Sequence, residues 1–366
     1  MSDIHTIQKN LLAWFASHAR KLPWRTHYAP YQVWISEIML QQTQMERVLT
    51  YFQRWMRRFP DPAAVAAAGE DEVLKLWEGL GYYSRARNIR RAAQILVDDY
   101  EGEFPQDFSA IRALPGIGDY TAGAIASIAF NQDVPAVDAN VERVLARLLD
   151  IDTPVKERKA RARIREAASG LICQGRAREV NQGLMELGAL ICRPRTPQCE
   201  TCPLHGSCEA RRLGIVLERP VPGKSKAIVP LDVVSGVLIH NGRIFIQKRL
   251  PQGVWANLWE FPGGRIEPGE SPAQALVREY REETGFGIEN LETIRVIRHG
   301  YTTYRITLHT FFCSLREGRT DPVLTAAQEC RWVVPADLGR YAFPAGHRKL
   351  IDTLARDLRF QARVRA

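Results

Sequence analysis

Four cysteines crowded into one short segment limit what this chain can fold into more than any other feature. Six, two and five residues separate them, and they are Cys192, Cys199, Cys202 and Cys208. Four thiolates this close in sequence can surround one metal centre only through a tight loop, and the prolines and the glycine between them provide the breaks for one. Such a site holds either zinc or an iron–sulfur cluster, and the cysteines alone leave both open.

The first part of the chain has the periodicity of helices. Apolar residues recur every three or four positions in Ile7–Phe15, Val33–Leu40, Val73–Leu80 and Ala122–Phe130. Proline and glycine clusters separate these segments. We therefore predict an all-α domain over residues 1–218, which includes the cysteine loop 192–208.

The character of the sequence changes after residue 218. Residues 219–230 have the composition of an exposed linker. Beyond it, Val233–His240 and Arg243–Lys248 are typical of strands joined by an Asn-Gly hairpin turn, and Thr303–Cys313 is a further strand candidate. Helical patterns follow at Ala273–Glu283 and His347–Leu358. We predict a second, α/β domain over residues 231–366 and hence a multidomain protein.

Charge favours a polyanionic partner. The formal net charge is +9, and Lys156–Arg219 holds 13 Lys or Arg against 7 Asp or Glu. A local basic excess suits DNA. No stretch approaches the ~20 apolar residues that a membrane helix needs. We expect a cytoplasmic protein, associated with the nucleoid, with no membrane partner.

The segment Leu114–Gly123 resembles a helix–hairpin–helix DNA-binding motif. Gly116 and Gly118 permit positive φ and close backbone approach, so amides that open the next helix can face a phosphate. Val137-Asp138-Ala139-Asn140 follows twenty residues later. This hairpin followed by the Asp138 string resembles the sequence pattern of the HhH-GPD glycosylase family. The resemblance implies that Asp138 is the family's catalytic aspartate.

Further strings resemble the MutY family within that superfamily. They are Trp34–Gln44, Leu22–Arg25 and Gly79–Asn88. The resemblance implies that Glu37 is the general acid, that Asp138 stabilises the oxocarbenium ion, and that Asn140 and Tyr120 support them. Bifunctional relatives carry a lysine at position 120, which forms a Schiff base; with Tyr120 no lyase step is expected.

The same resemblance implies a substrate, a partner and a cofactor. The substrate is adenine paired with 8-oxoguanine or guanine in duplex DNA, bound by a monomer, and the four cysteines ligate a 4Fe–4S cluster. Adenine leaves more easily when a ring nitrogen is protonated, so one carboxyl must be neutral to donate the proton. The other must be ionised to stabilise the cationic sugar. The resemblance further implies that Gln42 and Tyr82 wedge into the duplex, and that Arg25 and Gln182 line the adenine pocket.

The C-terminal part contains a complete Nudix box over Gly264–Phe286. Glu279, Glu282 and Glu283 share one helical face and could bind Mg²⁺. In the MutY family this domain resembles MutT and recognises 8-oxoguanine, commonly through Phe-Ser-His. Here Tyr301 and Thr302 could replace the first two residues, while the histidine is absent. Trp255, Leu258 and Trp259 form either core or a base-contacting surface, and we expect the core.

Three alternatives remain open from sequence. The first is an endonuclease III-type glycosylase/lyase for oxidised pyrimidines, which Tyr120 and the string around Glu37 disfavour. The second is a Nudix pyrophosphatase acting on 8-oxo-dGTP as an added activity. The third, a non-catalytic DNA-binding protein, does not explain why two carboxyls, a hairpin and a cysteine loop occur together.

Overall fold

The computed structural model describes residues 4–223, 227–316 and 320–365. The chain forms two compact units. The first comprises the described parts of Met1–Ala67 and Asn88–Ser225, and the second those of Ala68–Arg87 and Lys226–Ala366. Part of the predicted linker, residues 224–226, lies outside the described residues.

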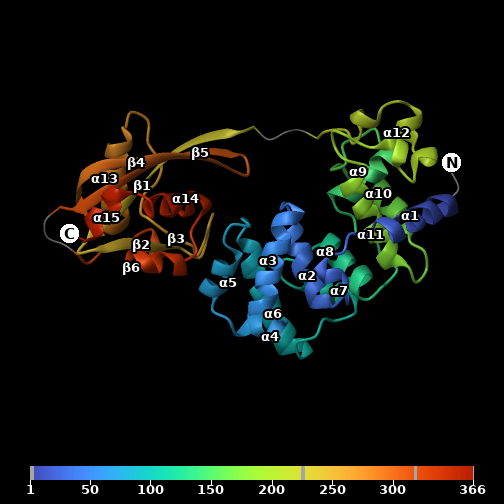
Figure 1. Ribbon diagram of the computed structural model, residues 1–366, viewed down its shortest axis with the longest axis horizontal. Coiled ribbons are helices and arrows are strands. Elements are labelled where there is room, and N and C mark those ends of the chain that lie inside the picture. The colour runs from blue at the N-terminus through green and yellow to red at the C-terminus, as the bar shows by residue number, and fades with distance from the viewer. Residues whose placement is uncertain (1–3, 224–226, 317–319, 366) are drawn as a thin grey trace. The chain divides into compact units, whose positions relative to one another are not determined.

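The first unit is helical, as predicted (Figure 1). Its helices are α1 (Ile4–His18), α2 (Pro30–Leu40), α3 (Met45–Arg58), α4 (Pro62–Ala67), most of α6 (Ser84–Tyr100), α7 (Phe108–Ala113), α8 (Asp119–Ala124), α9 (Ala139–Leu148), α10 (Arg158–Leu171), α11 (Ala177–Leu190) and the short α12 (Glu209–Arg212). A π-helical turn, Ile125–Ala129, continues α8.

Helices α1, α9, α10 and α11 share one hydrophobic core, in which Leu11, Leu145, Ile164 and Leu184 are buried. These residues sit on the apolar stripes of amphipathic helices, so that burial of one face holds each helix in place. Cys192, Cys202 and Cys208 pack against the same core. The cysteine loop is therefore attached to the helices that carry Asp138 and Gln182.

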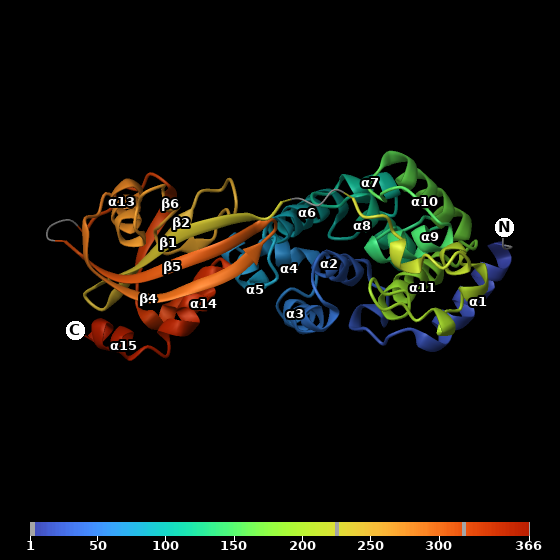
Figure 2. The same ribbon diagram turned by 90° about the horizontal axis from the view of Figure 1, so that it is seen from above.

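The second unit contains a six-stranded mixed sheet of order β3-β2-β1-β5-β4, with β6 paired to β2. Its strands are β1 (Val229–His240), β2 (Arg243–Arg249), β3 (Trp259–Glu260), β4 (Ile288–Tyr301), β5 (Tyr304–Leu315) and β6 (Ala327–Val333). Strands β1 and β5 are parallel, and β4 and β5 form a long antiparallel hairpin, visible from above in Figure 2.

Alternating side chains of this sheet enter two different cores. Val237 and Ile246 pack toward α14 (Ala345–Leu354) and α15 (Leu358–Arg365), whereas Leu238 and Phe245 pack toward α13 (Pro272–Thr284). A strand period of two produces this division. The helix predicted over His347–Leu358 is two helices, because α14 ends at Leu354 and a second helix starts at Leu358.

Two local predictions in this unit are confirmed by the backbone. Asn241 and Gly242 both have positive φ, at 47° and 66°, as a tight hairpin turn requires. Helix α13 begins with a capping box between Ser271 and Gln274 and ends at Gly285, whose φ is 70°. No helix in the described ranges is long and apolar enough to cross a membrane.

The second unit also includes a segment from the helical half of the sequence, residues 68–87, which carries α5 (Glu70–Trp77). Glu78 accepts hydrogen bonds from the Phe343 amide (2.9 Å) and Arg348 Nε (2.8 Å), and it pairs with Lys75 (2.5 Å). The Tyr83 hydroxyl donates to the Phe343 carbonyl. These buried polar contacts bind the segment to the C-terminal fold.

We predict that Glu78→Ala destabilises the second unit by about 2 kcal/mol, because an amide and a guanidinium lose their acceptor. Hydrogen exchange should then speed up in residues 68–87 together with the sheet. Asp337→Ala is the matched control, since it removes the Asp337–Arg340 pair, whose arginine is 78% exposed, and should cost under about 1 kcal/mol. Equal effects of the two variants would contradict this assignment of the segment.

Candidate active site

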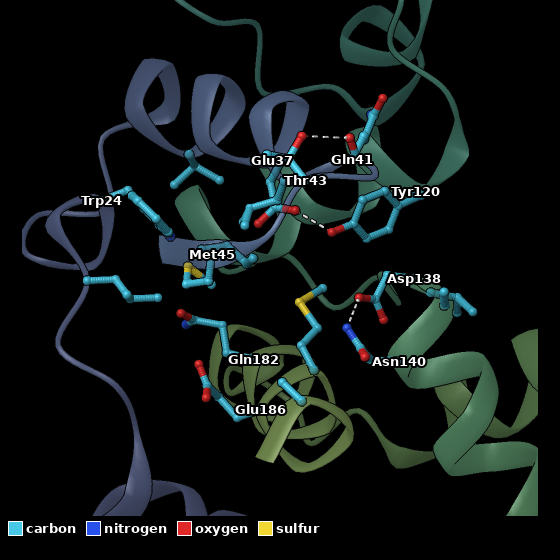
Figure 3. A pocket seen from close by; sticks show the side chains of 18 of the residues that line it. Trp24, Glu37, Gln41, Thr43, Met45, Tyr120, Asp138, Asn140, Gln182 and Glu186 are labelled. Atoms are coloured by element: carbon cyan, nitrogen blue, oxygen red, sulfur yellow. Dashed lines mark hydrogen bonds between the residues drawn. The ribbon is translucent and has the colours of Figure 1, made fainter. Parts of the chain in front are cut away.

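A pocket of about 590 Å³ lies within the first unit (Figure 3). Its walls come from α2, the loop after it, α8, the start of α9 and α11. The pocket brings together seven of the predicted residues: Arg25, Glu37, Gln42, Tyr120, Asp138, Asn140 and Gln182. Tyr82, Tyr301 and Thr302 belong to the other unit.

Glu37 is buried in α2, with 5% of its surface exposed. The Tyr120 hydroxyl donates a hydrogen bond to Glu37 Oε2. Burial raises the pKa of Glu37 to about 7, and the negative Asp138 adds to this, while the Tyr120 hydrogen bond and Arg25 oppose it. Burial also raises the pKa of Tyr120 far above its usual value, so that the phenol stays a donor.

Asp138 is the N-cap of α9. Its side chain accepts hydrogen bonds from the Val141 amide (2.7 Å) and from Asn140 Nδ2 (2.8 Å). Burial raises the pKa of Asp138 above its usual value, and both hydrogen bonds and the nearby Arg143 offset part of this rise. The donors around Asp138 therefore favour its ionised form, whereas Glu37 has one donor and a largely apolar setting.

Arg143 connects the aspartate to the cysteine loop. Its Nη2 donates to Asn140 Oδ1 (2.8 Å), and its Nε donates to the Cys192 carbonyl (2.7 Å). The same Asn140 donates to Asp138. The position of the aspartate is thus tied by hydrogen bonds to the first residue of the cysteine loop.

Glu186 is a pocket residue that the sequence reasoning missed. It lies one turn after Gln182 on α11, is fully buried, and pairs with Arg25 (2.6 Å) and Arg20 (2.7 Å). The ion pair fixes the Arg25 side chain at the pocket wall. The spacing of four residues from Gln182 is the signal that could have identified Glu186.

The two hairpin glycines differ in what they do. Gly116 has a φ of +79°, and a Cβ there would lie 2.6 Å from Asn88 Cβ, so only glycine fits. Gly118 has a φ of −96° and caps α8 with open space beside it. Both glycines permit positive φ, and of the two Gly116 adopts it, whereas the backbone of Gly118 suits any residue.

The four loop cysteines are free thiols that line one cavity with Arg147 and Arg211. Burial, with a smaller contribution from the other three cysteines, raises the pKa of the Cys202 thiol to about 11. Arg147 donates to Cys192 Sγ (3.3 Å) and to the carbonyls of Arg193 and Pro194. Within the described ranges, no three His, Cys, Asp or Glu side chains are close enough to hold a single metal ion.

The Nudix carboxylates of α13 are engaged with other protein groups. Arg278 pairs with Glu279 (3.0 Å), Glu282 (3.1 Å) and Glu270 (2.8 Å). Glu283 accepts from the Gly263 amide and from Gln247, and burial raises its pKa to about 8. The helix thus presents the predicted carboxylates on one side, with Arg278 bound among them.

Trp255 departs from the expected core. Leu258 and Trp259 are buried as predicted, but Trp255 is half exposed and its φ is +59°. Its ring centroid lies 5.1 Å from that of Tyr301. The tryptophan therefore faces the β4–β5 hairpin tip and solvent.

The fold and the pocket define a base excision glycosylase of the helix–hairpin–helix class joined to a Nudix domain. The HhH-GPD superfamily of base excision DNA repair proteins matches residues 35–169, and the NUDIX domain matches residues 234–353. The chain is 32% identical to the adenine DNA glycosylase of Rattus norvegicus, over 91% of this chain and 75% of the rat protein. It belongs to the adenine DNA glycosylase family, as predicted.

Two solved structures resemble the helical unit. A thermostable thymine-DNA glycosylase has a TM-score of 0.53 and 28% identity, and it covers 57% of this chain and 97% of its own. Endonuclease III, trapped as a covalent intermediate with DNA, has a TM-score of 0.50 and 25% identity, and it covers 59% of this chain and all of its own. The first is named as a DNA glycosylase, and the second was solved as a complex with DNA.

The raised pKa of Glu37 predicts a pH-dependent cost to stability. The Glu37 carboxyl has a pKa of 4.5 when unfolded and about 7 when folded. Its contribution therefore lowers the free energy of unfolding as pH rises from about 4.5 to about 7. Glu37→Gln removes this effect and should raise the free energy of unfolding relative to the unsubstituted protein, by about 2–3 kcal/mol more at pH 8 than at pH 5. Urea unfolding at the two pH values measures it.

The control for net charge is Glu103→Gln, which removes an exposed carboxylate from the same unit. It should leave the pH dependence unchanged. If Glu37→Gln gave the same small difference between pH 5 and pH 8 as Glu103→Gln, the buried carboxyl would not hold its proton near neutrality.

Proposed function

We propose that this chain removes adenine paired with 8-oxoguanine or guanine in duplex DNA, by hydrolysis of the N-glycosidic bond. The observation that carries the proposal is the pair of unlike carboxyls in one pocket. Glu37 is buried with a pKa of about 7, whereas Asp138 is surrounded by hydrogen-bond donors. One can supply a proton near neutral pH, and the other can remain negative.

Each carboxyl has a task in the proposed reaction. Glu37 donates its proton to a ring nitrogen of adenine, which makes the base a better leaving group. The sugar becomes cationic as the bond breaks, and the Asp138 carboxylate stabilises it electrostatically. Tyr120 holds Glu37 through its hydrogen bond, and Asn140 holds Asp138.

The remaining pocket residues would receive the extruded adenine. A base must leave the stack to reach such a pocket, at a cost of about a few kcal/mol. We propose that Gln182 and Arg25 contact the adenine, with Glu186 fixing Arg25, and that Gln42 enters the duplex. Gln42 has a φ of +59°, an uncommon conformation that also marks functional positions in other proteins.

Position 120 supports hydrolysis without strand cleavage. A glycosylase/lyase needs an amine at the reacting sugar. Tyr120 offers only a hydroxyl, which already donates a hydrogen bond to Glu37. We propose a monofunctional enzyme that acts as a monomer. On an A:8-oxoguanine duplex, cleavage should therefore appear only after alkali treatment.

The four cysteines fit a 4Fe–4S cluster. They are unpaired thiols around one shared cavity, and Arg147 lies beside them to offset thiolate charge. We propose Cys192, Cys199, Cys202 and Cys208 as its ligands; when bound, the cluster would supply a rigid cross-link and a redox-capable iron centre. Arg143 would then transmit the loop's position to Asn140 through its hydrogen bonds.

In the C-terminal unit we propose that Tyr301 and Thr302, at the tip of the β4–β5 hairpin, read the base opposite the adenine. The Nudix box then serves the fold, because Arg278 occupies its carboxylates and Glu283 binds the Gly263 amide. The described contacts give no reason to propose nucleotide hydrolysis as a second function.

We predict that Glu37→Gln lowers single-turnover adenine excision by about 10²–10⁴-fold, the usual contribution of a general acid. Duplex affinity should change little, because the substitution keeps size and hydrogen bonding. In the unsubstituted protein the rate should fall as pH rises above about 7, where Glu37 loses its proton. Glu103→Gln is the control and should excise normally. Full activity of Glu37→Gln would rule out the assigned acid.

For the cysteine loop, Cys199→Ala should lower the iron and sulfide content of the purified protein and its affinity for DNA together. Cys173→Ala is the matched control, since Cys173 lies outside the four-cysteine spacing and outside the shared cavity. Iron content is measured independently of activity. Full iron and sulfide in the Cys199 variant would remove Cys199 from the ligand set.

A further inference from the structure

Three aromatic side chains of the second unit meet at the tip of the β4–β5 hairpin. The ring centroid of Tyr301 lies 5.1 Å from that of Trp255 and 6.0 Å from that of Tyr82. They come from three separate segments, and each is half exposed. In the part of the chain that the structure describes, the two cores of the sheet are built without them.

The backbone under this aromatic cluster is strained. Six described non-glycine residues of the second unit have positive φ, and three of them are asparagines, which tolerate it. The other three are Tyr82 (48°), Trp255 (59°) and Thr302 (52°). A bulky or β-branched residue in this region is unusual, and such strain persists only where the surroundings enforce it.

The loop that carries Trp255 is held from several directions. Arg87 donates to the Ala256 carbonyl (2.9 Å), and the Asn257 side chain donates to Glu70. Gln328 donates to Asn257 Oδ1 (2.7 Å) and to the Arg249 carbonyl (2.6 Å). These contacts keep a half-buried tryptophan beside Tyr301.

We propose that Trp255 is a specificity-determining residue, which with Tyr301 and Tyr82 forms a stacking surface for the purine opposite the excised adenine. The inference rests on the proposed function of the hairpin tip and extends it to a residue outside that hairpin. The rings of Trp255 and Tyr82 are inclined to that of Tyr301 by 58° and 33°, so that each ring can offer its own half-buried face to a base. A stack of a base on an aromatic ring strengthens binding appreciably.

The test compares excision of adenine from A:8-oxoguanine and A:G duplexes by the full chain. Trp255→Leu should lower the ratio of the two kcat/KM values by about tenfold, chiefly by slowing the 8-oxoguanine substrate, and Trp255→Phe should restore most of the ratio. Trp332→Leu is the control. Trp332 packs on Phe245 in the core beside α13, away from the aromatic cluster, so its substitution should leave the ratio unchanged.

A double-substitution cycle separates stacking from folding. If Trp255 acts through the surface it shares with Tyr301, the Trp255→Leu/Tyr301→Leu protein should discriminate no worse than Tyr301→Leu alone. An unchanged ratio in Trp255→Leu, or an equal loss on both substrates, would overturn the inference. If the unsubstituted chain excised no adenine, the proposed function itself would fail instead.

Discussion

The chemistry proposed for this chain depends on keeping one carboxyl, that of Glu37, out of water. Glu37 sits in a helix whose other residues, Trp34, Ile35 and Ile38 among them, are almost wholly buried. Burial disfavours the charged form and thereby keeps a proton on Glu37 near neutrality. The same burial makes the folded state less stable once Glu37 is ionised, above about pH 7. Catalytic centres commonly sacrifice stability for activity in this way. The rest of the pocket is arranged around that proton.

The second carboxyl is buried as well, but α9 surrounds it with hydrogen-bond donors that offset part of the cost of its charge. As the N-cap, Asp138 receives the Val141 amide, and Asn140 adds a second donor. Positive helix-end dipoles also favour its charge. Arg143 holds Asn140 and at the same time the Cys192 carbonyl. One helix thus combines charge stabilisation with attachment to the cysteine loop.

Sequence reasoning located the local features well and the tertiary partners poorly. The Asn241-Gly242 turn and the pattern behind α13 depend on neighbouring residues, and both could be read directly. The assignment of residues 68–87 to the second unit depends on Glu78 meeting Phe343 and Arg348, more than 260 positions away. Glu186 was missed for the same reason, since its partners Arg20 and Arg25 are distant in sequence.

Trp255 illustrates a third limit. A large apolar residue is expected in the core, and the hydrophobicity of Trp255 favours that interpretation over a base-contacting surface. Its exposure results from a positive φ that distant hydrogen bonds enforce through Ala256 and Asn257. In the proposed mechanism the excision chemistry resides in the helical unit, whereas the strained Tyr82, Trp255 and Thr302 belong to the other unit. Because strain is retained where a contact surface requires it, the hairpin is the part of this chain in which base preference can change without altering the acid–base pair.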